Sequence, residues 1–329
     1  MELVDRMING NIISLARLIS LIESGDDQVP QIMKHIYPHT GKAYRIGLTG
    51  PPGVGKSTLV DKLTSVIRSQ DLTAGIIAVD PTSPFSGGAV LGDRIRMQQH
   101  YLDQGVFIRS MATRGSLGGL PKTAGEVVNI IDASGKDIIL IETVGVGQSE
   151  LDIIKNVDTV VVILAPGAGD SIQTMKAGLL EIADIFVINK ADTPGADDLV
   201  SEIQNMLQLN TRRREIWEIP VIATQAINND GIEILYQQIQ SHRQTISESG
   251  LLAQQRKEQH REQFINTIEQ KISAELLRMM KQDEQLKKYI DKVETGEIDP
   301  YSATNEILSS ENLLDMLAQQ LLHRKRHNE

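Results

Sequence analysis

The chain contains no cysteine and few aromatic side chains. The absence of cysteine from all 329 residues excludes disulfides, Cys-ligated zinc, iron–sulfur clusters and thiol catalysis. Phe, Trp and Tyr make up only 3% of the residues, so platforms on which nucleic-acid bases could stack are scarce. Positive charge is not in excess either, because the formal net charge is −10 at pH 7, which disfavours binding to a phosphate backbone. The composition favours a globular enzyme with an aliphatic core.

The chain shows no targeting or membrane signal. Its first five residues, Met-Glu-Leu-Val-Asp, are acidic where a signal peptide is basic. No apolar run reaches the roughly 20 residues that span a bilayer. We therefore expect a cytoplasmic protein.

The middle of the chain alternates short aliphatic runs with helix-length segments. This alternation predicts an α/β fold, with a mainly parallel sheet covered by helices on both faces. Functional loops are expected at the carboxyl ends of the strands. The predicted strands are residues 44–49, 74–80, 105–109, 137–142, 158–165, 184–189 and 218–223.

Helical patterns flank this region on both sides. Apolar residues at helical spacing predict one helix over residues 3–23 and a second, shorter one to about Tyr37. In the C-terminal part, an apolar stripe predicts a long amphipathic helix, broken by Gly296 and Pro300 and followed by a last helical stretch over 302–323. The stripe residues are Phe264, Ile265, Ile268, Ile272, Leu276 and Met279 or Met280. Such a stripe packs either on its own domain or on a second copy. The predicted domains are an N-terminal helical extension (1–42), a G domain (43–245) and a C-terminal helical arm (246–329).

Residues 50–57 read Gly-Pro-Pro-Gly-Val-Gly-Lys-Ser, the spacing of a phosphate-binding P-loop, between a predicted strand and a predicted helix. Glycines allow backbone N–H groups to turn inward around phosphate oxygens. Lys56 can reach the β- and γ-phosphates, Ser57 can bind Mg²⁺, and Thr58 can donate toward an earlier phosphate. The predicted phosphate-binding residues are Gly50, Pro52, Gly53, Val54, Gly55, Lys56, Ser57 and Thr58.

A second motif, Asn189-Lys190-Ala191-Asp192, follows a later predicted strand and indicates guanine. The Asp192 carboxylate can accept hydrogen bonds from N1–H and the 2-amino group of guanine, which adenine does not present. Asn189 would brace the site, and the Lys190 stem would cover the base. After the last strand, Thr224, Gln225 and Ala226 can contact the base edge through the backbone. The two motifs together favour a GTPase over an ATPase.

A third group of residues is expected to sense Mg²⁺ and the γ-phosphate. Glu142 stands where a common GTPase has Asp, and the Gly145 N–H would meet the γ-phosphate. Val146 replaces the water-positioning glutamine of Ras-like proteins, so intrinsic hydrolysis should be slow. Asp80 and Asp93 offer further carboxylates, although either can be an ordinary cap or turn residue. The predicted catalytic residues are Lys56, Asp80, Asp93, Glu142 and Gly145, and the predicted metal ligands are Ser57, Asp80, Asp93 and Glu142.

Together these motifs resemble the MeaB/ArgK family of GTPases, which includes the human methylmalonic aciduria type A protein. The stretches that carry the resemblance are 47–57, 80–84, 87–89, 91–94, 114–115, 118–119, 142–150 and 189–192. Glu142 departs from common GTPases but agrees with this family. The resemblance implies a SIMIBI-type G domain and a homodimer held by C-terminal helices. It also implies a GTPase chaperone, with GTP/GDP and Mg²⁺ as ligands, that gates adenosylcobalamin delivery to, and protection of, an acyl-CoA mutase. The usual client is methylmalonyl-CoA mutase, and a mobile partner-responsive loop would fall on residues 165–176.

Other readings of the sequence stay open. A nickel-delivery GTPase needs soft or imidazole ligands, and the closely spaced histidines His323 and His327 lie in a basic tail. A transport-associated ATPase or kinase would use ATP, against which Asp192 argues. Arg109 and Arg114 are the cations that could neutralise transition-state charge, although a structural arginine is the commoner case.

Overall fold

The computed structural model describes residues 2–80, 97–112, 121, 123–144, 153–167, 180–209, 216–282 and 284–309. The chain forms two compact units, Met1–Gln259 and His260–Glu329. Within the described residues, no helix is long and apolar enough to cross a membrane.

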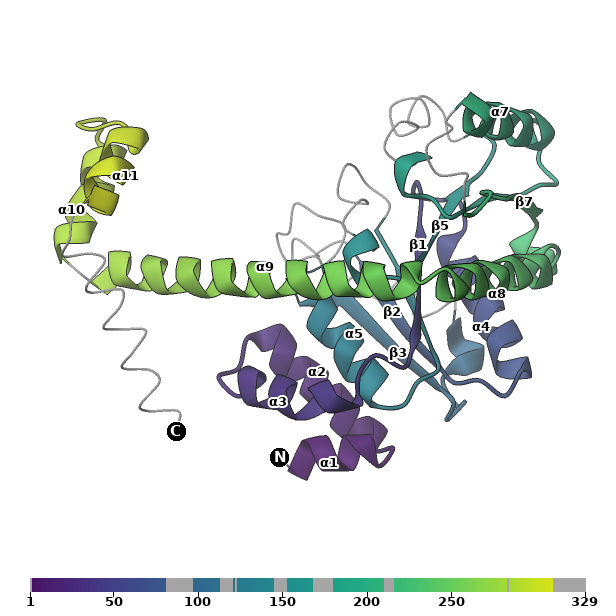
Figure 1. The fold of residues 1–329 in the computed structure, drawn as a ribbon, viewed down its shortest axis with the longest axis horizontal. Helices are drawn as coiled ribbons and strands as arrows, with labels where there is room; N and C mark the ends of the chain where they lie inside the picture. Colours follow the sequence, from purple (N-terminus) through teal and green to yellow (C-terminus); the bar gives the residue numbers. More distant parts are fainter. Residues whose placement is uncertain are drawn as a thin grey trace. The chain divides into compact units, whose positions relative to one another are not determined.

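The first unit is built on a seven-stranded sheet in the order β3-β2-β4-β1-β5-β6-β7, in which every neighbouring pair is parallel. This arrangement confirms the predicted α/β fold (Figure 1). The predicted strands agree with the structure to within three residues, the largest differences being at the end of β3 and the start of β7. The strands are β1 (Tyr44–Thr49), β2 (Ala74–Asp80), β3 (Val106–Ala112), β4 (Ile138–Glu142), β5 (Thr159–Leu164), β6 (Ile185–Asn189) and β7 (Val221–Thr224).

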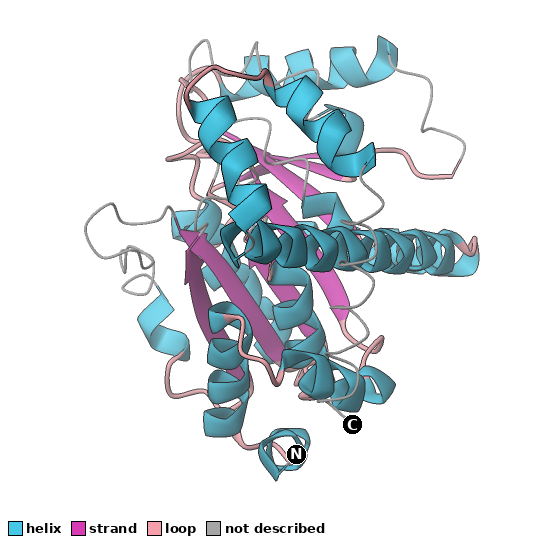
Figure 2. Cartoon of the chain, turned by 90° about the vertical axis from the view of Figure 1, so that its left-hand side faces the viewer, coloured by secondary structure: helices cyan, strands magenta, loops and turns pink. Residues whose placement is uncertain are grey.

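Helices cover both faces of the sheet, and each face has its own apolar core. One core holds Leu59 and Leu63 of α4 and Leu235 of α8, packed on alternate strand residues. The opposite core holds side chains of α5, α7 and the N-terminal helices. Figure 2 shows the strands in magenta between these helices in cyan. The helices are α4 (Lys56–Ser69), α5 (Ala124–Ala133), α7 (Ala196–Leu209) and α8 (Ile232–Glu248), and short 3-10 turns lie at η1 (Tyr37–His39) and η4 (Ala226–Asn228).

The N-terminal extension consists of α1 (Glu2–Ile8), α2 (Ile12–Ser24) and α3 (Val29–Ile36). The single helix predicted over residues 3–23 is therefore wrong, because the chain breaks between α1 and α2. Gly10 adopts a φ of 89°, and the Asn11 side chain accepts a hydrogen bond from Ser14 N at 2.8 Å, which caps α2. Apolar residues keep their helical spacing across this break, so the apolar pattern of the sequence does not indicate it.

The C-terminal helices are α9 (Leu251–Gln282), α10 (Glu284–Glu294) and α11 (Pro300–Ser309). The long helix is confirmed as α9, and α10 follows it after residue 283, which lies outside the described residues. The predicted break is also confirmed, because α10 ends at Glu294, just before Gly296, and α11 begins at Pro300. In the second unit, Met279 and Leu286 form a small core with Leu276, Met280 and Ile307 around them.

Candidate nucleotide site

The loops that carry the three motifs all leave the same edge of the sheet. In a parallel sheet the carboxyl ends of the strands meet at one edge. Leu48 of β1 lies opposite Glu142 of β4, and Asn189 of β6 lies opposite Thr224 of β7. The phosphate loop after β1 (50–57) therefore lies between the segment that begins at Glu142 at the end of β4, here called the switch segment, and the base motif (189–192) after β6.

The loop between β1 and α4 has a backbone that requires glycine. Gly50, Gly53 and Gly55 have φ values of 142°, 78° and 99°, a region that other L-residues rarely adopt. A Cβ atom on Gly50 would lie 2.0 Å from the carbonyl oxygen of Ile163. The loop is thus pressed against β5, with Pro52 and Gly53 exposed at its tip.

Lys56 is the first residue of α4, and its side chain folds over the loop. The Nζ atom donates to the carbonyl oxygens of Gly50 at 2.8 Å and Pro51 at 3.1 Å. The side chain lies along the loop at the amino end of a helix, where backbone N–H groups and the helix dipole favour an anion. Thr58, in the same first turn, is half-buried.

Ser57 and Glu142 form the polar contact that joins α4 to β4. The Ser57 hydroxyl donates to Glu142 Oε1 at 2.7 Å, and both residues are buried. A hydroxyl beside a carboxylate is the hard oxygen set that suits Mg²⁺. Asp80 is buried at the end of β2, the strand next to β4. The described residues hold no group of three or more His, Cys, Asp or Glu side chains suited to a metal. This donor set fits an ion that phosphate oxygens and water would share.

Asn189 connects the base motif to the phosphate loop. Its Nδ2 donates to the carbonyl of Val54 at 2.8 Å, and its Oδ1 accepts from Thr224 Oγ1 and from Ala226 N, both at 3.1 Å. A Cβ atom on Gly55 would lie 2.3 Å from Asn189 Nδ2. Asn189 thus makes three hydrogen bonds that tie β6, the phosphate loop and the loop after β7 together.

The residues beside Asn189 face solvent. Lys190 has a φ of 59° and is exposed, as is Asp192. The Ala191 N–H donates to the carbonyl of Thr224 at 3.0 Å, which holds this loop against the loop after β7. Gln225 is half-buried at the start of that second loop. The Asp192 carboxylate is therefore carried on a fixed backbone with its surface accessible to a ligand.

Two threonines in this region were not identified from the sequence. Thr143 Oγ1 donates to Thr49 Oγ1 at 3.0 Å, and the Thr143 N–H donates to the carbonyl of Leu48 at 3.1 Å. These contacts fix the start of the switch segment to the last residues of β1. A threonine at a strand end is too common to signal this role.

Several predicted residues lie outside the described part of the chain. They are Asp93, Gly145, Val146, Arg114, residues 168–176 of the partner-responsive loop, His323 and His327. Arg109 is described, and it lies on β3 with its guanidinium paired to Glu23 and 3.2 Å from Ser20 Oγ, both on α2. Those contacts favour the structural reading of Arg109 over an arginine finger.

Comparison with known proteins gives consistent matches. The family model described as methylmalonyl Co-A mutase-associated GTPase MeaB matches residues 15–281. A "Putative GTPase" of Pyrococcus abyssi is 50% identical over 309 residues, covering 93% of this chain and 95% of that protein. The mitochondrial methylmalonic aciduria type A homolog of Mus musculus is 33% identical, covering 93% of this chain and 79% of its own length. A crystal structure described as an LAO/AO transport system kinase superposes with a TM-score of 0.69 at 26% identity, covering 98% of this chain and 97% of that one.

Proposed function

The chain belongs to the MeaB family of GTPases, and on that premise we propose that it is a GTP-driven chaperone of an adenosylcobalamin-dependent acyl-CoA mutase. We propose methylmalonyl-CoA mutase as its client, because the description of the family names that enzyme. GTP binding and hydrolysis would gate delivery of the cofactor to the mutase and protect the loaded enzyme.

The mutase part of this proposal rests on the family match, and the observation that carries its nucleotide-binding part is the hydrogen bond from Asn189 to the phosphate loop. Asn189 lies three positions before Asp192, the residue that can read guanine. Its side chain donates to the carbonyl of Val54, which is part of the loop that can hold phosphates. The base-reading loop and Val54 are therefore held together by this hydrogen bond. This connection supports a single site for a guanine nucleotide at the carboxyl edge of the sheet.

The residues of the nucleotide site would have different roles in binding and hydrolysis. Lys56 would move from the carbonyls of Gly50 and Pro51 to the β- and γ-phosphates, while the loop N–H groups receive phosphate oxygens. Asp192 would accept from the guanine N1–H and 2-amino groups. Ser57 and Glu142 would hold Mg²⁺, which neutralises phosphate charge when bound.

We also propose that the protein is a homodimer assembled through α9. Five large apolar side chains on this helix are between 41% and 65% exposed, and such an exposed stripe marks an interaction surface. They are Phe264, Ile265, Ile268, Ile272 and Leu277. Sedimentation of the wild type should give a dimer, and the double change Ile268→Glu with Ile272→Glu should give a monomer. A monomeric wild type would contradict this proposal, and Gln270→Ala on the same helix is the control.

The client is tested by measuring GTP hydrolysis by the purified protein alone and with equimolar methylmalonyl-CoA mutase, with ATP as the control nucleotide. We expect slow GTP turnover alone, clear acceleration by the mutase and loss of both activities in Lys56→Ala. A GTP turnover rate that the mutase does not change would contradict the assignment of methylmalonyl-CoA mutase as the client. Faster turnover of ATP than GTP would contradict the guanine site itself.

A further inference from the structure

Gly231 lies against the end of β7, where the structure leaves no room for a side chain. It has a φ of 75°, a backbone conformation that glycine adopts readily and other L-residues rarely do. A Cβ atom at this position would lie 2.5 Å from the carbonyl oxygen of Ala223 and 3.0 Å from Thr224 Cγ2. Non-bonded heavy atoms pack best about 3.5–4.0 Å apart, so a side chain here would force either β7 or the start of α8 to move.

The start of α8, which follows Gly231, is held by the core. The Leu235 N–H donates to the carbonyl oxygen of Gly231 at 3.0 Å. Ile232, Leu235 and Ile239 are buried in the core that α8 shares with α4. A shift of this helix would open gaps between close-packed apolar side chains, which is destabilising. The helix therefore resists displacement.

The end of β7 is less constrained than α8. In the described sheet β7 is the last strand, it has four residues, and β6 is its one neighbour. Ala223 is exposed, and Val221 is only half-buried. A side chain at position 231 would therefore displace the end of β7, where Ala223 and Thr224 lie, in preference to α8.

The loop between β7 and α8 is closed at its base. Gln225 and Asp230 exchange two backbone hydrogen bonds, from Gln225 N at 3.1 Å and from Asp230 N at 3.2 Å. Inside the loop, the Ala226 N–H donates to Asn189 Oδ1 at 3.1 Å. Because the two ends of the loop are tied together, a change confined to the loop cannot separate Gly231 from β7.

Thr224, at the end of β7, holds the base motif at two points. Its Oγ1 donates to Asn189 Oδ1 at 3.1 Å, and its carbonyl oxygen accepts from the Ala191 N–H at 3.0 Å. Ala191 directly precedes Asp192, the residue that can read guanine. A displacement of Thr224 would therefore shift the backbone that carries the Asp192 carboxylate.

From these contacts we infer that Gly231 is a positioning residue for guanine recognition. Its lack of a side chain allows β7 to end where Thr224 can hold both Asn189 and Ala191. Gly231 would act through Thr224 and not by contact with the base. This inference rests on the proposed guanine site and adds to it a residue that sets the position of Asp192.

The test measures how well the full-length protein distinguishes GDP from inosine diphosphate (IDP), which lacks the 2-amino group of guanine. The measured quantity is the Kd for IDP divided by the Kd for GDP, each obtained by displacement of fluorescent GDP. In the wild type this ratio should be at least about 10, because IDP forgoes one hydrogen bond to a charged carboxylate. Gly231→Ala should weaken GDP binding about tenfold and lower the ratio to about 3 or less. An overall loss of folded protein would weaken both nucleotides equally and leave the ratio unchanged.

Gly250→Ala is the matched control for backbone conformation. Gly250, between α8 and α9, has a φ of 79°, but a Cβ atom there would meet nothing within 4 Å. This variant carries the same backbone cost without the contact, so it should keep the wild-type ratio. Thr224→Val removes the hydroxyl that binds Asn189 and should lower the ratio without any change at Gly231. If Gly231→Ala does not fold, Thr224→Val decides alone.

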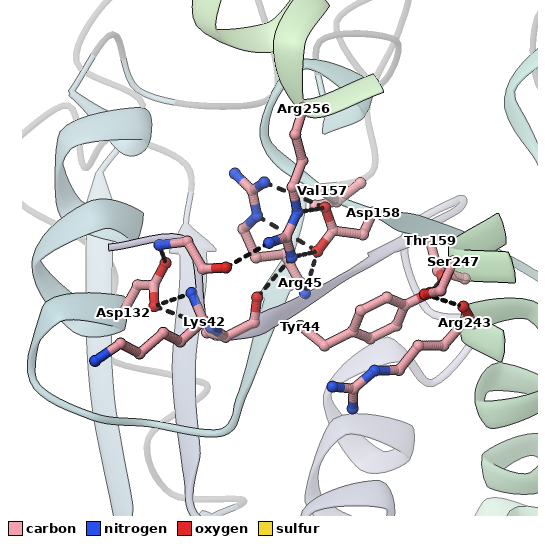
Figure 3. Close-up of polar contacts among 12 residues, drawn as sticks. Lys42, Tyr44, Arg45, Asp132, Val157, Asp158, Thr159, Arg243, Ser247 and Arg256 are labelled. Atoms are coloured by element: carbon pink, nitrogen blue, oxygen red, sulfur yellow. Dashed lines mark hydrogen bonds and ion pairs between the residues drawn. The ribbon is translucent and has the colours of Figure 1, made fainter. Parts of the chain in front are cut away.

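A buried ionic cluster at the opposite, amino-terminal edge of the sheet provides a control for stability. The Asp158 carboxylate, whose side chain has no exposed surface, is bound by Arg45 of β1 and Arg256 of α9, and Figure 3 shows both guanidinium groups converging on it. Arg256 donates to Asp158 Oδ2 at 2.7 Å and to Oδ1 at 3.0 Å. It also donates to the carbonyl oxygens of Gly41 at 2.7 Å and Ala43 at 2.8 Å.

The same cluster includes Asp132 of α5. Its carboxylate accepts from the N–H groups of Gly41 and Ala43, at 2.6 and 2.9 Å (Figure 3). Arg256→Lys should lower the melting temperature, because the single ammonium of lysine cannot reproduce the four hydrogen bonds of the planar guanidinium. Its ratio should nevertheless stay at the wild-type value, since these contacts lie at the edge away from the base motif.

The outcomes separate the inference from the proposed function. A wild-type ratio in a folded Gly231→Ala, or in Thr224→Val if that variant has to decide, would overturn the inference. A lowered ratio in Gly250→Ala or Arg256→Lys would overturn it as well, because the ratio would then report backbone strain or stability and not the position of Asp192. A wild type that binds GDP no more tightly than IDP would instead contradict the proposed guanine site itself.

Discussion

Both edges of the sheet carry polar side chains, but these side chains differ in what they contact. At the carboxyl edge, Lys190 and Asp192 are exposed, and the phosphate loop presents Pro52 and Gly53 to solvent. At the amino edge, Asp158 is fully enclosed and bound by two arginines. An exposed group on a fixed backbone, such as Asp192, can bind a ligand, whereas the enclosed Asp158 carboxylate, bound by two arginines, fixes the chain.

Charge burial explains why the amino edge is built this way. A carboxylate removed from water is destabilising unless charged partners and hydrogen bonds replace the lost hydration. Burial alone lowers the pKa of Arg256, but hydrogen bonding to Asp158 together with the negative charges of Asp158 and Asp132 outweighs this effect and raises the pKa overall. The Arg256 guanidinium therefore stays charged. The result is a rigid junction between β1, β5 and α9.

The largest expected effect is at the carboxyl edge. Lys56→Ala should lower GTP hydrolysis by about 10³-fold, because it removes the side chain that neutralises developing phosphate charge. Single-turnover hydrolysis measures this. Lys62→Ala, on the same helix but with an ion pair only to the adjacent Asp61 among the residues that the structure describes, should keep the wild-type rate. Equal losses in both variants would show that α4 tolerates no substitution and that Lys56 has no special role.

The amino edge should respond in stability. Asp158→Asn should lower the free energy of unfolding by about 3–5 kcal/mol, because it leaves two arginines near a group that no longer carries charge. Urea unfolding of the full chain measures the change. Asp27→Asn, at an exposed position, should alter it by less than about 0.5 kcal/mol. An equally small change in the free energy of unfolding of Asp158→Asn would contradict the structural role given to the amino edge.

Base recognition should change without a change in stability. Asp192→Asn should weaken GTP binding by about 10²-fold, since an amide cannot accept from both guanine donors. The same variant should bind xanthosine triphosphate more tightly than the wild type does, because xanthine has a carbonyl where guanine has an amino group. Nucleotide titration with Asp197→Asn as the exposed control measures both. A loss of GTP binding together with a lower melting temperature would place Asp192 among the structural residues.

The smallest effect is expected from Tyr44 at high pH. Burial, which is the largest cause, raises the pKa of Tyr44 well above its ordinary value of 10.0. A group whose pKa is raised by folding contributes its full stability below the unfolded pKa and loses it as the pH rises. Above pH 10 the wild type should therefore lose up to about 1.4 kcal/mol per pH unit more than Tyr44→Phe. Urea unfolding between pH 8 and 11 checks this, and parallel curves for the two proteins would refute it.

The sequence was informative about the carboxyl edge because its chemistry uses short, ordered motifs. The residues of this edge lie close together in the chain or at strand ends, so their pattern predicts their contacts. They include Gly50, Gly55, Lys56 and Asn189. The amino edge uses Arg45, Asp132, Asp158 and Arg256, which come from four separate elements. Ion pairs between distant single residues have no local pattern, so only the folded chain reveals them. The break at Gly10 was missed for a different reason, since the apolar spacing runs on through it.

The most direct test of the guanine site is competition between GDP and ADP for the wild-type protein in the presence of Mg²⁺. Fluorescent GDP would be bound first, and each unlabelled nucleotide would then be titrated against it. We expect GDP to displace the probe at concentrations at least about 10²-fold lower than ADP, because the site is built around hydrogen bonds that adenine lacks. Displacement by both nucleotides at similar concentrations would contradict the assignment of Asp192 and the guanine site with it.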